Sequence, residues 1–89
     1  MRAMLLVLLL ITGTAAAVQN TVAFGSRLVS TGDSAGKVRQ VAGEPDALTV
    51  LETRNGGAAG ERWEYYERGK TITIWMRGGR VVAIEEVLN

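Results

Sequence analysis

RWEYYERGKTITIWMRGGRVVAIEEV, residues 62–87, is the stretch of the chain that decides the fold. Aromatic and β-branched residues alternate with polar residues along it, and glycines interrupt the alternation at two points. This pattern predicts three short antiparallel strands joined by two tight turns. We therefore expect the rest of the chain to pack around this meander.

The first turn, residues 68–69, sets the pairing of the first two predicted strands. Residues directly opposite each other in an antiparallel pair share a face of the sheet. A two-residue turn here places Tyr65 opposite Ile72 and Trp63 opposite Ile74. The four large apolar side chains then lie on one face, which we call the inner face.

The second turn can form in two ways. A two-residue loop over residues 78–79 sets Ile72 opposite Glu85, whereas a three-residue loop over residues 77–79 sets it opposite Ile84. We favour the three-residue loop because it keeps the apolar side chains together. The inner face is then predicted to carry Trp63, Tyr65, Ile72, Ile74, Met76, Val82 and Ile84.

The opposite, outer face is polar, with a strip of aromatic and aliphatic side chains across it. Exposed aromatic and arginine side chains are enriched in protein interfaces, so this strip is a candidate interface. Alternatively, Arg62 stacks on Trp75 and shields it, or the leader or a loop covers it. The candidate interface residues are Arg62, Tyr66, Trp75, Val81 and Ala83.

One short helix is predicted before the meander. Ser34 is a suitable N-cap, Gly43 stands where a helix ends, and Pro45 prevents its continuation. Apolar residues recur at helical spacing between these positions, over about two turns. We expect this helix to pack on the inner face of the sheet.

The other segments carry weaker signals. Residues 18–22 are predicted to be a loose or strand-like leader, followed by a bend at Gly25. Residues 46–54 read as a strand of ambiguous parity, for which we prefer Leu48 and Val50 inward. The glycine-rich residues 55–60 are predicted to form a mobile loop. The expected fold is α+β: one short helix packed on an antiparallel β-meander of three to four strands.

The first 17 residues resemble an export signal. Arg2 is followed by an apolar run and then by Ala15, Ala16 and Ala17, which predicts cleavage after Ala17. The apolar run is too short to span a bilayer, and without Cys there is no acylation site, so we expect no stable membrane anchor. Residues 18–89 are then a single small α+β domain, periplasmic or secreted.

Composition narrows the class of partner. The chain has ten Lys and Arg and nine Asp and Glu, and Arg2 is the only charge in the predicted signal, which leaves nine of each sign. This balance argues against nucleic acid as a partner. A domain this small without disulfides holds a modest core, so we expect a protein partner in the cell envelope or self-association.

The sequence argues against an enzyme. It contains neither His nor Cys, and its acidic residues are spread along predicted strands and turns instead of being paired. The acids also match no known set of metal ligands, so neither a metal nor a cofactor is expected.

Several motifs resemble a family of small exported proteobacterial proteins of unknown function. The motifs are FGSRLVSTGDSAGKVRQVAGEP, then ERWEYY and MRGGRVVAIE, against a family pattern CGSxLVxxGDS, VxxxCGEP, WxY and FxxGxVxxI. The two family cysteines fall at Phe24 and Ala42, which implies an apolar contact in place of a disulfide. More distantly, the chain is similar to the SmpA/OmlA lipoprotein, a binding protein that assists outer-membrane assembly. The positions that match the pattern of the small exported family are Gly25, Leu28, Val29, Gly32, Asp33, Ser34, Val38, Gly43, Glu44, Pro45, Trp63, Tyr65, Gly79, Val82 and Ile84.

Two functions remain open, and we favour the first. The first is a non-catalytic protein–protein interaction in the cell envelope through the outer face, for which an uncovered apolar patch around Trp75 would be the sign; this includes an inhibitor of a periplasmic enzyme. The second is the binding of a small ligand or cell-wall fragment between helix and sheet, near Asp33, Glu44 and residues 55–60. A concave pocket with convergent polar groups would indicate the second function.

Overall fold

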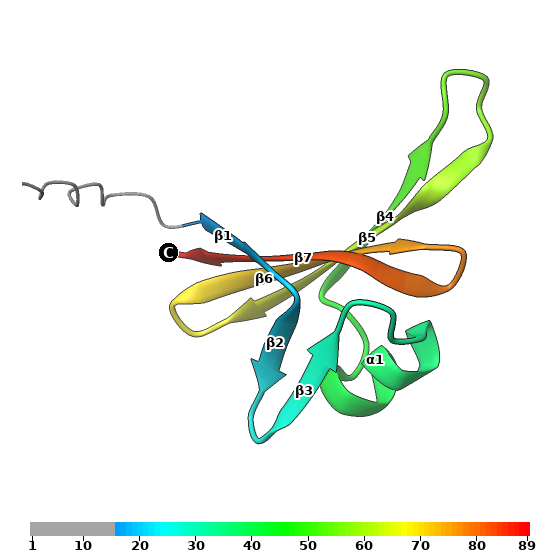
Figure 1. Cartoon of the computed structure of the whole chain (residues 1–89). Coiled ribbons are helices and arrows are strands. Elements are labelled where there is room, and N and C mark those ends of the chain that lie inside the picture. Colours follow the sequence, from blue (N-terminus) through cyan, green and yellow to red (C-terminus); the bar gives the residue numbers. More distant parts are fainter. Residues whose placement is uncertain (1–15) are drawn as a thin grey trace, which may run out of the picture.

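The structure, a computed structural model, describes residues 16–89 (Figure 1). Five strands form one antiparallel sheet in the order β1-β7-β6-β5-β4, and two further strands form a separate hairpin. One helix, α1, is present in the described residues; it follows the hairpin and precedes β4. The elements are β1 (Ala16–Gln19), β2 (Thr21–Phe24), β3 (Arg27–Ser30), α1 (Ala35–Ala42), β4 (Ala47–Glu52), β5 (Ala58–Glu67), β6 (Lys70–Arg77) and β7 (Arg80–Leu88).

The chain is α+β as predicted, but the expected three to four strands are wrong. The main sheet has five strands and a second sheet has two. The predicted leader, residues 18–22, forms the end of β1 and the start of β2. β1 pairs with β7 and sets Gln19 opposite Ile84. The bend at Gly25 is a hairpin turn between β2 and β3, with Gly25 at φ 65°. These strands have four residues each, too few for an alternating pattern to distinguish them from loops.

The predicted signal lies mostly outside the described residues. The predicted cleavage point after Ala17 falls within β1. Cleavage there would leave Val18 and Gln19 of this strand, paired with β7.

The register of β5 on β6 is confirmed. Tyr65 is opposite Ile72 and Trp63 is opposite Ile74, as the two-residue turn between these strands requires. All four side chains are buried. Their burial forms the centre of the inner face.

The predicted three-residue loop between β6 and β7 is wrong. Arg77 pairs with Arg80, so the loop is Gly78 and Gly79, which both have positive φ as two-residue hairpin loops commonly require. The extra residue is Val82, which lies in the strand instead of the loop. Met76 pairs with Val81 and Trp75 pairs with Ala83, so β7 contains a β-bulge at Val82.

The two-residue loop reverses the predicted faces of two valines. Val81, expected on the outer face, pairs with Met76 and is 2% exposed, whereas Val82, expected inside, is 50% exposed. After the bulge, Ile84 faces Ile74 and is fully buried on the inner face, as predicted. The bulge therefore restores the apolar alignment that we had assigned to a longer loop.

Helix α1 begins and ends where the sequence predicts. The Ser34 hydroxyl accepts a hydrogen bond from the Lys37 backbone N–H at 3.1 Å, and Gly43 is the C-cap with φ 83°. The preceding turn is bonded to the sheet, because the Val81 N–H donates to the Asp33 carbonyl oxygen at 2.8 Å. The start of the helix is thus held on β7.

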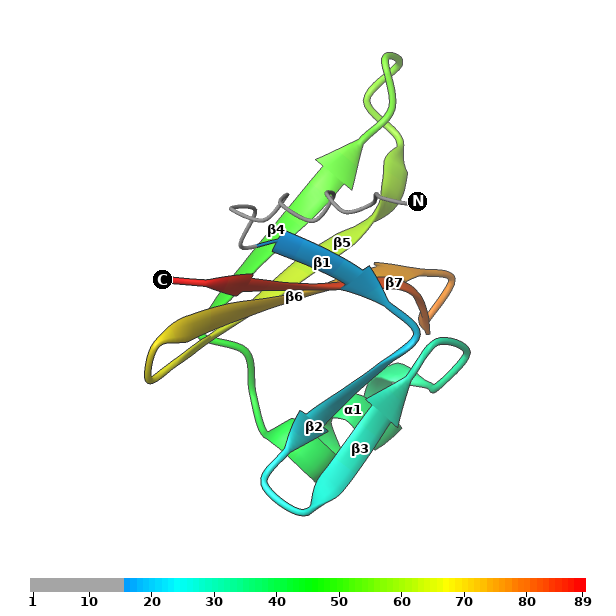
Figure 2. The same cartoon turned by 60° about the vertical axis from the view of Figure 1, so that its left-hand side comes forward.

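The second layer of the fold consists of α1 and the β2–β3 hairpin, which lie on the same side of the five-stranded sheet (Figure 2). Val38 of α1 and Val22 and Val29 of the hairpin are buried against the inner face. The sheet contributes the rest of the core: Trp63, Tyr65, Ile72, Ile74, Met76, Val81 and Ile84.

The β4–β5 hairpin extends away from this second layer (Figure 1). Leu48 and Val50 are opposite Trp63 and Glu61, so they face inward as predicted. They are nevertheless 42% and 54% exposed, because this end of the sheet projects beyond α1 and the β2–β3 hairpin. The predicted loop over residues 55–60 is shorter than expected, since β5 already begins at Ala58.

Candidate functional site

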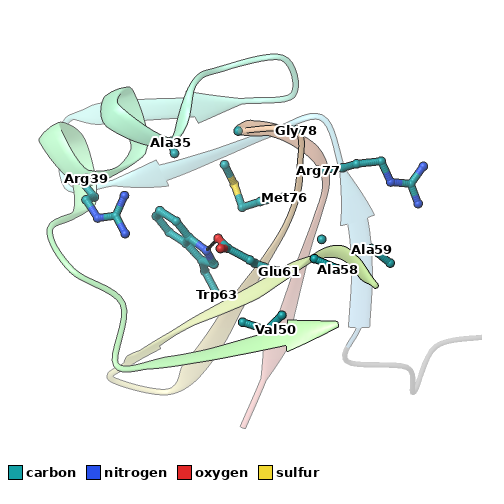
Figure 3. A pocket seen from close by; sticks show the side chains of 12 residues that line it. Ala35, Arg39, Val50, Ala58, Ala59, Glu61, Trp63, Met76, Arg77 and Gly78 are labelled. Carbon is teal, nitrogen blue, oxygen red and sulfur yellow. Dashed lines mark hydrogen bonds between the residues drawn. The ribbon is translucent and has the colours of Figure 1, made fainter. Parts of the chain in front are cut away.

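A cleft of about 400 Å³ opens between α1, the β6–β7 turn and the inner face of β4 and β5 (Figure 3). Apolar side chains form most of its walls, and Arg39 and Glu61 contribute opposite charges. In Figure 3, Arg39 points toward Trp63 from the helix, whereas Arg77 at the rim points away from the cleft. The apolar lining residues are Ala35, Val50, Ala58, Ala59, Trp63 and Met76.

The cleft exists because the residues around it are small. Residues 58–60 and 78–79 are alanines and glycines, which leave the space above the sheet unfilled. The helix is anchored at its edge, since the Ala35 N–H donates to the Gly79 carbonyl oxygen at 2.9 Å. At Gly60, φ is 150° and a Cβ would collide with the Met76 carbonyl oxygen, so only glycine fits this wall.

Trp63 forms the floor of the cleft and is held from two sides. Its indole Nε1–H donates to Glu61 Oε1 at 2.7 Å. The Arg39 guanidinium lies 4.4 Å from the centre of the indole ring, a cation–π contact. The side chain is 1% exposed, so the indole is rigid and shielded.

Arg39 also forms an ion pair at the rim. Its Nε donates to both carboxylate oxygens of Glu44 at 3.1 Å, and the Glu44 side chain is 75% exposed. Among the described residues, the two terminal nitrogens of Arg39 make no hydrogen bond. Those nitrogens can donate hydrogen bonds to a bound anion while Nε keeps its ion pair with Glu44.

Tyr65 lies next to Trp63 on the inner face and has a structural role. Its hydroxyl donates to the Gly43 carbonyl oxygen at 2.8 Å, which holds the end of α1 on the sheet. Phe24 packs edge-on against its ring at 5.1 Å. Burial, with a smaller contribution from the charge of Glu44, raises the pKa of the Tyr65 hydroxyl to about 12.

Asp33, which the sequence suggested for a ligand site, holds a turn instead. Its carboxylate accepts from the Ser30 N–H at 2.8 Å and from Lys37 Nζ at 3.3 Å. The backbone hydrogen bond from Ser30, with a further contribution from Lys37, lowers the pKa of this carboxyl group. Neither Asp33 nor Glu44 lines the cleft, although Glu44 reaches its rim through Arg39.

The structure brings four of the five candidate interface residues onto the outer face. Arg62, Trp75 and Ala83 form one cross-strand row. Tyr66 is 57% exposed, while Arg62, Trp75 and Ala83 are half-buried. Val81 does not belong to this group, because the two-residue loop sets it opposite Met76 and buries it in the core. The expected apolar strip is therefore narrower than the sequence predicts.

The polar groups of the outer face interact with one another. The Tyr66 hydroxyl donates to Glu64 Oε1 at 3.1 Å, and this hydrogen bond raises the pKa of the hydroxyl. Arg62 Nε lies 3.8 Å from Glu64 Oε2 and makes no hydrogen bond. The cation–π contact of the described residues joins Arg39 to Trp63, not Arg62 to Trp75 as the alternative interpretation assumed.

Sequence reasoning missed most of the cleft. It weighed residues 55–60 near the site but not Arg39, Glu61 or Met76. The available signal was the run of small residues 58–60, which precedes the bulky residues of β5. Which other segments face that run depends on how α1 docks on the sheet.

Residues 16–89 contain no group of acidic side chains that could hold a metal ion. Their one helix has eight residues, far short of the length needed to cross a membrane. Comparisons with protein-family models, with curated proteins and with solved structures give no match. The resemblances to the small exported family and to the SmpA/OmlA lipoprotein therefore remain hypotheses.

Proposed function

We propose that this chain is a non-catalytic binding protein of the cell envelope, periplasmic or secreted, and that its ligand binds in the cleft beside α1. The observation that supports this proposal is a cleft of about 400 Å³ with apolar walls and two charged side chains. Sites for small molecules have this size and this mixture of apolar walls with few polar groups. The envelope location rests on residues 1–17 of the sequence alone.

The charged groups indicate the kind of ligand. Arg39 offers hydrogen-bond donors at the helix side of the cleft, which favour a carboxylate. Glu61 already accepts from Trp63 through Oε1, and its Oε2 can accept an N–H from the ligand. The apolar surface that a ligand can reach comes from Val50, Ala58 and Ala59, because Trp63 and Met76 beneath them are buried. The ligand class that fits is a short peptide end with a small apolar residue and a free carboxylate, as in the peptide stems of cell-wall fragments.

The test uses the fluorescence of Trp63. The chain has two tryptophans, so Trp75→Phe leaves Trp63 as the only tryptophan that can be excited selectively. A muramyl peptide ending in D-alanyl-D-alanine is titrated into this variant. Binding in the cleft should change the emission of Trp63 in a saturable manner.

Two arginine variants in that background identify the site. Arg39→Ala should weaken binding about 10- to 150-fold, because one charge-assisted hydrogen bond contributes about 1.5–3 kcal/mol. Arg62→Ala on the outer face is the matched control and should leave the affinity unchanged. If Arg62→Ala weakens binding and Arg39→Ala does not, the cleft is not the site. Arg39→Lys keeps the charge and should give an intermediate affinity.

A second candidate function is contact with a protein partner through the outer face. The observation that favours it is the 57% exposure of Tyr66 beside the row of Arg62, Trp75 and Ala83. Capture of one protein from periplasmic extract by the wild type, but not by folded Trp75→Ala, would support it. Equal capture by both proteins would exclude Trp75 from the contact.

A further inference from the structure

The outer edge of β4 is the longest unpaired strand edge in the described part of the chain. β4 ends the five-stranded sheet, with six residues against four in β1 at the other end. Proteins protect such edges with charges, prolines, bulges or short strands, because unpaired backbone groups recruit another strand. Residues 47–51, ALTVL, contain no charge and no proline, and the register shift comes only after Leu51.

We propose that β4 pairs antiparallel with β4 of a second copy of this chain, which joins the two sheets into one. This goes beyond the proposed ligand binding and does not depend on it. The occupant follows from the sequence of the edge, because the strand is complementary to itself. A two-fold axis at Thr49 places Leu48 of each copy opposite Val50 of the other, and Ala47 opposite Leu51.

This register satisfies both faces of the joined sheet. Leu48 and Val50 face inward, and they are the exposed apolar side chains of the β4 inner face, at 42% and 54%. Pairing covers them with each other across the two-fold axis. Ala47, Thr49 and Leu51 meet their counterparts on the outer face, so no apolar residue faces a charge.

Other registers are worse. If one β4 strand is shifted by one position along the other, a residue of the inner face of one copy stands opposite a residue of the outer face of the other. A shift by two positions sets Leu48 opposite Glu52, or Val50 opposite Asp46. Thr49 is therefore the one centre that keeps residues 47–51 paired among themselves.

The acidic residues at the ends of the strand do not prevent this pairing. Asp46 and Glu52 of opposite copies face each other in the chosen register. The Asp46 carboxylate, however, turns back to its own sheet and accepts a hydrogen bond from the Tyr66 N–H at 2.8 Å. Arg54 stands two residues after Glu52 and adds one positive charge to this end of the hairpin.

The test is disulfide trapping, since the natural chain has no Cys. Opposite Cα atoms in an antiparallel pair are about 4.5–5.5 Å apart, which suits a disulfide. In the chain purified after export, Thr49→Cys should form a covalent dimer under mild oxidation about tenfold faster than Val82→Cys. Val82 is the control because it is 50% exposed and lies in β7, which β6 and β5 separate from β4. Equal rates, or a Thr49→Cys protein that stays monomeric, would overturn the proposal.

Charge variants provide a second readout by sedimentation velocity. The wild type should sediment as a dimer at high concentration. Thr49→Lys should be monomeric, because the two lysines meet at the axis, and so should Thr49→Glu. An equimolar mixture of the two variants should recover the dimer, while Val82→Lys should dimerise like the wild type. A monomeric wild type, or dimers of Thr49→Lys alone, would contradict the pairing; circular dichroism verifies that each variant is folded.

Discussion

Removing the hydroxyl of Tyr65 tests how the helix is held on the sheet. Tyr65→Phe deletes the donor to the Gly43 carbonyl oxygen and keeps the ring that Phe24 contacts. One such hydrogen bond contributes about 1 kcal/mol net, and Gly43 is exposed, so water replaces part of the loss. We therefore expect the free energy of unfolding at pH 7 to fall by about 1 kcal/mol, or a Tm lower by about 4–8 °C.

Alkaline pH should make the wild type less stable than Tyr65→Phe. The folded state raises the pKa of Tyr65 from its ordinary value near 10 to about 12, so the neutral hydroxyl is favoured in the fold. This contribution is complete below pH 10 and is lost as pH rises toward 12. Two pKa units correspond to about 2.7 kcal/mol at most, and about half of that is lost by pH 11. The wild type should then lose its advantage over Tyr65→Phe near pH 11.

Urea unfolding at several pH values between 7 and 11.5 measures this effect. Tyr66→Phe is the matched control, because the Tyr66 hydroxyl is exposed and bonds only to Glu64 on the outer face. We expect this control to change stability by no more than about 0.5 kcal/mol at pH 7. If Tyr65→Phe is as stable as the wild type at pH 7, or if their difference stays constant above pH 10, the proposed role of the hydroxyl is refuted.

Three further predictions concern Gly60 in the wall of the cleft and the residues Asp33 and Ser34 at the start of α1. Gly60→Ala should reduce the free energy of unfolding by about 1–3 kcal/mol, measured by urea unfolding, because its Cβ would collide with the Met76 carbonyl oxygen; unchanged stability would contradict the close approach. Ser34→Ala should cost about 1 kcal/mol through loss of the helix cap, whereas a Tm equal to that of the wild type would show that the cap is dispensable. The lowered pKa of Asp33 means that its stabilisation is complete above about pH 4 and is lost as pH falls. Asp33→Asn should therefore be less stable than the wild type at pH 7, with a difference that shrinks in acid, and a constant difference between pH 7 and pH 2 would refute the role of its bond to Ser30.

The faces of the last strand illustrate where sequence reasoning reached its limit. Ile84 can be placed on the inner face, opposite Ile74, in two ways: by a three-residue loop before β7, or by a two-residue loop followed by a bulge within β7. The chain places the extra residue in the strand, which buries Val81 and exposes Val82. One of the five candidate interface residues was misplaced for this reason. The energies that separate loop from bulge depend on the contacts of the whole sheet, including the turn before α1 that bonds to Val81.

The cleft depends on tertiary structure in the same way. Residues 58–60 were assigned to a mobile loop because small residues carry no pattern that distinguishes a strand from a turn. In the fold they belong to β5, and the missing side chain volume becomes the wall of a cleft once α1 docks above it. Arg39 looked like any exposed helix residue, and its contact with Trp63 connects segments that are distant in sequence.

The sequence by itself determined the features that follow from local rules. The turn at residues 68–69 decides the pairing of β5 with β6, and Ser34 and Gly43 decide the ends of α1, because neighbouring residues supply the interactions. Only the tertiary structure decided the added strand β1, the bulge in β7, the exposure of β4 and the cleft. These features arise from which face of the sheet another segment covers, and that choice is made by contacts between residues far apart in the chain.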